Sequence, residues 1–156
     1  MMPYVIQTLM GAMGSVGFAI LFNVRGYRLI FFFLGGALDW AVYLLCKENG
    51  CSLFVSVFLA TATAAFLSEV LARLVRAPVL ILLVPMLIPL IPGSDLYYTM
   101  DALIRQEQEI FFTRGTMAVT GAGAIAVGII CMTALSHLIF GIVEYFHKHH
   151  FLDNKN

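Results

Sequence analysis

Apolar residues fill five long stretches of this chain, and short polar segments separate them. A transmembrane helix needs about 17–25 mostly apolar residues, and four of the five stretches reach that length. The stretches are residues 5–22, 29–46, 52–71, 79–91 and 116–140. This pattern predicts an all-α membrane protein in which residues 1–156 form a single integral-membrane domain, a bundle of about five transmembrane helices.

The fourth stretch is too short to span a bilayer unaided, and prolines interrupt it. Each proline removes a backbone N–H and clashes with the preceding helical turn. In hydrocarbon, a freed carbonyl is tolerated only where protein or a water-filled cavity satisfies it. Broken hydrophobic helices of this kind point to a transporter's binding site; the alternative is a rigid kink that only shapes packing. We expect the substrate-binding residues here: Pro85, Pro89, Pro92, Gly93, Ser94, Asp95, Tyr97 and Tyr98.

Two polar segments follow. Residues 95–114 repeat apolar positions at helical spacing, which predicts an amphipathic helix that lies at the membrane interface or extends the fourth helix. Residues 141–156 form a polar tail that contains the tract His147–His150. The tract resembles a metal site, but a tail offers no fixed second shell, so we expect no metal and no cofactor.

The composition supports a membrane protein and excludes other classes. The chain is 61% hydrophobic and 12% charged, with a mean hydropathy of +0.93, whereas soluble domains carry roughly 25% charged residues. The formal net charge is +0. The sequence has no basic patch of the kind that binds nucleic acid, so we expect no nucleic-acid partner. The three cysteines form no disulfide framework; Cys46 and Cys51 could pair across a short extracytoplasmic loop, but free thiols are favoured. No enzyme motif is present, so we expect no enzyme.

The arginines predict the orientation, because short cytoplasmic loops are enriched in positive charge. Arg25 and Arg28 follow the first stretch, and Arg73 and Arg76 follow the third. We therefore place these loops in the cytoplasm and the N-terminus outside. Five crossings put the C-terminus inside, whereas a re-entrant fourth stretch would reverse the tail and place its lysines outside.

Two acids lie within apolar stretches. Asp39 is near the middle of residues 29–46, where an aspartate costs about 2.5–3.5 kcal/mol on insertion scales. It is a candidate for proton coupling, or else a packed acid that binds a neighbouring helix. Glu69 is a second candidate, but Arg73 follows it by four residues, the favourable spacing for a helical ion pair.

Small residues recur on one face of several stretches, which lets helix backbones approach closely in lipid. They are Gly11, Gly14 and Ser15; Ala60, Ala64 and Ser68; and Gly121, Ala124 and Gly128. Close packing without a further role is the simplest interpretation. Trp40 and Tyr43 suit interfacial anchors and pocket walls equally well.

Three segments together resemble a known family, the threonine/serine exporters, and in particular their small subunit, which corresponds to the C-terminal half of the full-length proteins. The segments are GSVGFAILFNVRGYRLIFFFLGGALDW, LSEVLARLVRAP and LVPMLIPLIPGSDLYYTM. The resemblance implies proton-driven export of threonine and serine, or of a dicarboxylate such as succinate, across the plasma membrane. It also implies a larger membrane subunit resembling the N-terminal half; a homo-oligomer is the alternative.

The resemblance carries over to individual positions only in part. Glu69 and Arg73 match its Ser-Glu…Ala-Arg stretch, and five residues match its broken-helix motif: Pro85, Pro92, Gly93, Tyr97 and Tyr98. Asp39 is not part of the pattern, which places Glu69 ahead of it for proton coupling. Two other functions stay open at this point, a membrane scaffold that transports nothing and a passive pore.

Overall fold

The computed structural model describes the backbone of residues 2–153 and the side chains of residues 4–139 and 141. Within this part of the chain every regular element is a helix, which confirms the all-α prediction. The elements are α1 (Met2–Leu21), the 3-10 turn η1 (Gly26–Arg28), α2 (Leu29–Glu48), α3 (Leu53–Val75), α4 (Val79–Leu87), the 3-10 turn η2 (Ile88–Leu90), α5 (Gly93–Ile104) and α6 (Gln108–Asp153).

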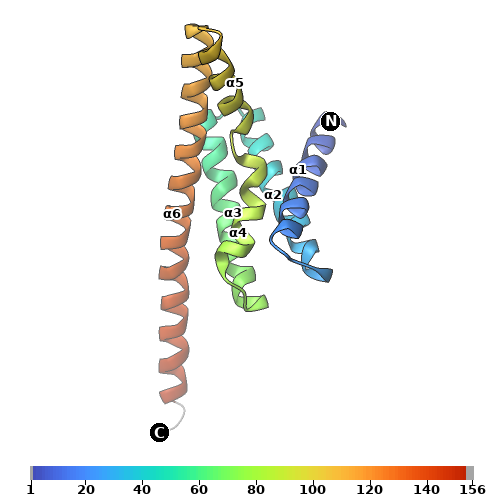
Figure 1. The fold of residues 1–156 in the computed structure, drawn as a ribbon. Coiled ribbons are helices and arrows are strands. Elements are labelled where there is room, and N and C mark those ends of the chain that lie inside the picture. Colours follow the sequence, from blue (N-terminus) through green and yellow to red (C-terminus); the bar gives the residue numbers. More distant parts are fainter. Residues whose placement is uncertain (1, 154–156) are drawn as a thin grey trace.

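The helices pack against their neighbours along the chain and also against more distant helices. α1 packs against α2, α2 against α3, and α5 against α6, while α6 also returns to pack along α3. α4 contacts α1, α2 and α3 and so lies in the middle of the bundle. Figure 1 shows α4 and α5 running one after the other in one direction and the long α6 returning in the opposite direction.

Four single helices of the described chain are long and apolar enough to cross a membrane: α1, α2, α3 and α6. The segments Val79–Leu90 and Gly93–Ile104 meet the same criterion only as a pair, bent by 55° at the break between them. An all-α membrane bundle with four or five candidate spans is therefore confirmed, and the bent pair is the fifth if it crosses as one span. α6 has 46 residues and is about 69 Å long at 1.5 Å per residue, so it extends beyond the other helices (Figure 1).

Small residues lie where helices approach each other closely, at α4 and at the contact between α3 and α6. A Cβ added at Gly35 would lie 2.6 Å from the sulfur of Met86, so α2 has room for α4 only because this position is glycine. Met86 is fully buried and accepts a hydrogen bond from the Ser68 hydroxyl at 3.6 Å. At the α3–α6 contact, a Cβ at Gly128 would lie 3.0 Å from Thr61. The predicted small-residue faces therefore do lie at helix contacts.

The prediction of one helix over residues 95–114 is wrong. α5 ends at Ile104 and α6 begins at Gln108, so the segment is an antiparallel hairpin of two helices. Gln106 adopts the left-handed conformation, with φ 60°, and the Glu107 N–H donates to the Ala102 carbonyl at 2.9 Å. This is a Schellman ending, for which glycine is the usual signal; a glutamine at that position concealed it.

Candidate functional site

The break in the fourth stretch lies where its prolines predict it. Pro85 lies inside α4, and the helix tightens into η2 around Pro89 before it stops. Ile91 is extended, and α5 starts directly after Pro92. Because proline has no N–H, Pro85 and Pro89 leave the carbonyls four residues earlier without the donor that a continuous helix supplies.

A small pocket of about 140 Å³ lies at this break. Five elements meet there: α2, α3, η2, α5 and α6. Its lining residues are Trp40, Tyr43, Leu53, Val57, Pro89, Leu90, Ile91, Pro92, Ser94, Asp95, Met117 and Gly121. A Cβ added at Gly121 would lie 3.3 Å from Pro92, so this glycine lets α6 close one side of the pocket.

Asp39 lies on the same face of α2 as this pocket wall. Tyr43, which lines the pocket, follows Asp39 by four residues, the spacing that brings helical side chains together. Asp39 is 0% exposed, and neither of its carboxyl oxygens has a hydrogen-bond partner in the described part of the chain. The indole N–H of Trp40 is likewise buried without an acceptor there. A buried donor therefore lies in the pocket wall and a buried acid lies one helical turn along α2 from Tyr43, and neither has a hydrogen-bond partner in the described chain.

Comparison with family models gives a match over residues 7–135 to the family described as "Threonine/Serine exporter, ThrE". The chain belongs to the threonine/serine exporter family. This is a transporter family, so the chain is an exporter-type, multi-pass membrane protein. No curated protein and no solved structure matches the chain significantly.

In this exporter-family chain the residues predicted to bind substrate separate into two groups. Pro89, Pro92, Ser94 and Asp95 line the pocket at the break. Asp95 also accepts a hydrogen bond from Arg114 at 2.9 Å, so an ion pair already engages its carboxylate.

The other four do not line the pocket. Pro85 is buried within α4. Tyr97 and Tyr98 are 67% and 48% exposed on α5, where their rings meet edge to face and Arg114 of α6 lies over Tyr98. Gly93 is exposed, its φ is not positive, and no atom lies within 4 Å of a Cβ added there.

Glu69 forms the ion pair that its spacing predicts. The Arg73 guanidinium donates to the Glu69 carboxylate at 2.8 Å and also to the Glu69 backbone carbonyl at 2.8 Å. Glu69 itself is buried, at 4% exposure. The two candidate acids therefore differ: Glu69 has a cationic partner, and Asp39 has none in the described chain.

Sequence reasoning missed one polar group of the core, the Thr61 hydroxyl, and gave no specific contact for another, the Ser15 hydroxyl. Both are fully buried and lack a hydrogen-bond partner among the described residues. Each packs against a glycine of another helix, Ser15 against Gly36 and Thr61 against Gly128. The sequence signal for these contacts was a hydroxyl residue that lies among small residues at helical spacing. The tertiary structure decides which helix each hydroxyl faces. The side chains of His147–His150 lie outside the described residues.

Proposed function

We propose that this chain is one subunit of a proton-coupled exporter, in which the pocket at the broken helix contributes to the substrate site and Asp39 carries the proton. The proposed substrates are small hydroxy amino acids, threonine or serine, or a dicarboxylate such as succinate. The observation that carries the proposal is the position of Asp39, a fully buried carboxyl group without a partner, one helical turn from the pocket wall.

The argument for Asp39 rests on the cost of burying charge. A carboxylate in apolar surroundings costs several kcal/mol unless a partner compensates its charge. Asp39 has no such partner in the described chain, so a proton or a bound substrate must supply the compensation. If Asp39 is protonated in one state and contacts the bound substrate in the other, proton movement is linked to substrate movement. Glu69 needs neither a proton nor a substrate for this purpose, because Arg73 compensates its charge. The order suggested by the family resemblance is therefore reversed in this proposal.

The pocket offers a polar substrate few but suitable groups. The Trp40 indole N–H is an unused donor that suits a carboxylate oxygen, and the Ser94 hydroxyl can donate or accept. The carbonyls freed by Pro85 and Pro89 belong to Ile81 and Pro85, which lie earlier in α4 and do not line this pocket. Tyr43 and Asp95 are the other polar side chains of the lining, and the remaining residues are apolar.

The size of the pocket supports a partner. Small-molecule sites usually enclose roughly 300–1,000 Å³, whereas the pocket at the break has about 140 Å³. A second chain would supply the missing wall. We propose the larger subunit that resembles the N-terminal half of the full-length exporters, with a second copy of this chain as the alternative. In this arrangement the arginine loops and the C-terminus face the cytoplasm, the N-terminus faces outward, and the complex lies in the plasma membrane.

Proteoliposomes that contain the chain with its larger subunit test the coupling. An amide cannot exchange a proton as a carboxyl group does, so Asp39→Asn should abolish export driven by a proton gradient and preserve exchange of labelled substrate down its own gradient. Glu69→Gln should retain driven export. Asp101→Asn, which changes an acid that pairs with Arg105 and does not line the pocket, is the matched control. Driven export at the wild-type rate by Asp39→Asn would refute Asp39 as the proton carrier.

Two further measurements separate the other functions. The chain reconstituted alone should not export, and full activity without the larger subunit would remove the partner from the proposal. Accumulation of substrate against its gradient distinguishes an exporter from a passive pore, which only equilibrates. A scaffold would show no flux of its own and no dependence of flux on Asp39.

A further inference from the structure

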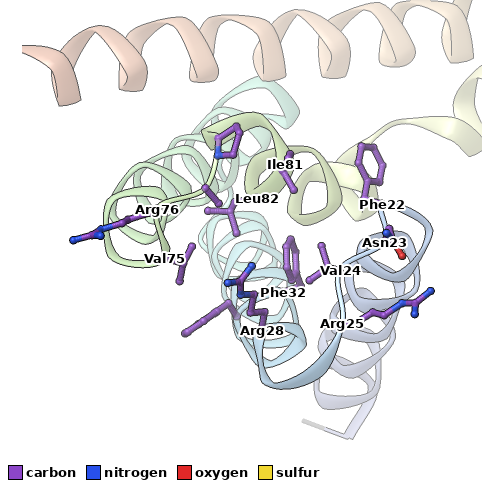
Figure 2. A pocket seen from close by; sticks show the side chains of 13 residues that line it. Phe22, Asn23, Val24, Arg25, Arg28, Phe32, Val75, Arg76, Ile81 and Leu82 are labelled. Carbon is purple, nitrogen blue, oxygen red and sulfur yellow. The ribbon is translucent and has the colours of Figure 1, made fainter.

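A second and larger pocket lies at the end of the bundle where α1 and α3 terminate. It has a volume of about 510 Å³, within the range of roughly 300–1,000 Å³ that is usual for small-molecule sites. The link between α1 and α2 forms one side, and the link between α3 and α4 forms the other (Figure 2). Its lining residues are Phe22, Asn23, Val24, Arg25, Arg28, Phe31, Phe32, Val75, Arg76, Ala77, Pro78, Ile81 and Leu82.

The charge of this pocket is one-sided. Arg25, Arg28 and Arg76 line it, and no acidic residue does. Among the side chains that the structure describes, the other arginines each pair with a carboxylate, in the ion pairs Arg73–Glu69, Arg105–Asp101 and Arg114–Asp95. The three pocket arginines have no acidic partner in that part of the chain. The protein therefore gathers its uncompensated guanidinium groups around one cavity.

The three arginines differ in position. In the view of Figure 2 the Arg28 side chain lies between Val75 and Phe32, whereas Arg25 and Arg76 point away from the other labelled residues; all three side chains are exposed. Buried Phe32 and Leu82 provide an apolar floor. An apolar surface beside a cation weakens the screening by water and strengthens its attraction for an anion.

Two backbone features lie at the edge of this pocket. Asn23 and Arg76 adopt the left-handed conformation, with φ 62° and 52°, and these residues end the turns after α1 and α3. α4 begins beside the pocket at Val79, and no side chain caps its first turn. The Ile81 N–H already donates to the Pro78 carbonyl at 3.2 Å, so this end of α4 contributes the positive end of the helix dipole, which attracts a negative charge.

We propose that this pocket binds an anion that carries a carboxylate or phosphate group, with Arg28 as the central ligand and Arg25 and Arg76 at the rim. The guanidinium fork matches both groups in a bidentate manner. Two sources offer this chemistry: a soluble organic or inorganic anion, and the headgroup phosphate of an anionic lipid.

Arginine loops also serve as orientation signals, and lysine serves that purpose equally because only the charge is needed. A bidentate anion site, in contrast, depends on the planar fork and does not tolerate lysine as a neutral replacement. The variant Arg28→Lys therefore separates the two roles, since it keeps the charge and removes the fork.

The binding test uses the purified full chain in nanodiscs of phosphatidylcholine. Succinate and inorganic phosphate are titrated separately, and the rise in melting temperature that a ligand of the folded state produces is recorded. Arg28→Gln should weaken binding of the soluble anion at least tenfold, and Arg28→Lys should weaken it measurably. Arg105→Gln removes the same charge from the distant hairpin and should bind as the wild type does.

A second arm tests the lipid source. The chain is placed in nanodiscs that contain phosphatidylglycerol, and native mass spectrometry counts the lipid molecules that remain bound. Loss of retained phosphatidylglycerol in Arg28→Gln, with no response to soluble anions, assigns the site to the headgroup.

Melting curves without ligand show which variants fold; if Arg28→Gln does not, Arg28→Lys and Arg76→Gln replace it. The proposal is overturned if neither kind of anion shows binding that depends on these arginines. It is also overturned if Arg105→Gln has the same effect as Arg28→Gln, because the response would then report only net charge.

Discussion

The contact between α1 and α2 offers the sharpest test of the packing described above. Gly36 of α2 faces Ser15 of α1, and a Cβ added at Gly36 would lie 2.6 Å from the Ser15 Cβ and would also overlap the Ser15 hydroxyl. The Gly11 carbonyl oxygen would lie 3.3 Å away. Two carbon atoms are most favourably placed at about 3.5–4.0 Å, so Gly36→Ala must push the two helices apart or distort one of them.

The size of the effect follows from two opposing terms. Inserting a methyl group into a well-packed contact costs about 1–3 kcal/mol, and replacing glycine by alanine within a helix gains about 0.5–1 kcal/mol. Gly17→Ala in α1 gains the same helix term without the clash, because no atom lies within 4 Å of its added Cβ. The difference in unfolding free energy between the two variants should therefore be about 1–3 kcal/mol, with the helix term cancelled.

Unfolding in mixed detergent micelles, followed by circular dichroism, measures this difference. The cycle is completed with Ser15→Gly and with the double variant Ser15→Gly/Gly36→Ala, which removes the main clash. Gly36→Ala should destabilise the protein less in the Ser15→Gly background than in the wild type. The reasoning fails if Gly36→Ala is as stable as Gly17→Ala, or if the effects of the two substitutions simply add.

Three further outcomes are expected. In a background without the native cysteines, a single cysteine at Asn49 should react with a membrane-impermeant reagent on intact cells and one at Arg76 should not; the opposite pattern would invert the proposed topology. Glu69→Gln removes the charge of the ion pair between Glu69, which is buried, and Arg73, whose side chain is 40% exposed. The free energy of unfolding should therefore fall by about 1 kcal/mol, while proton-driven export continues. Loss of driven export without loss of folded protein would return Glu69 to the coupling role. Gly121→Leu should block the pocket at the break and reduce export by at least tenfold at a near-normal folded yield, and export at the normal rate would show that substrate does not pass this pocket.

Some features of the chain depend only on residues that are close together in the sequence, and the sequence alone determined these features. The apolar stretches are long enough to predict the membrane helices, because the length of a span is set by the bilayer. The prolines around Pro89 predict the break, since a missing N–H disrupts a helix wherever it falls. The spacing of Glu69 and Arg73 predicts their ion pair, and the structure confirms it at 2.8 Å.

Features that depend on contacts between helices could not be obtained in this way. The sequence placed Tyr97 and Tyr98 in the candidate site, but in the folded chain both are exposed on α5 and neither lines the pocket at the break. It ranked Asp39 below Glu69, yet only the packed bundle shows that Asp39 is buried without a partner in the described chain.

The arginines illustrate the same division. Their positions in two separate loops were evident from the sequence and predicted an orientation. That Arg28 and Arg76 border one cavity was decided by the tertiary structure, because α4 folds back between α1, α2 and α3 and brings the two loops together. Local rules determine where each helix begins and ends, whereas the fit of side chains from distant segments decides which of their loops form a common pocket.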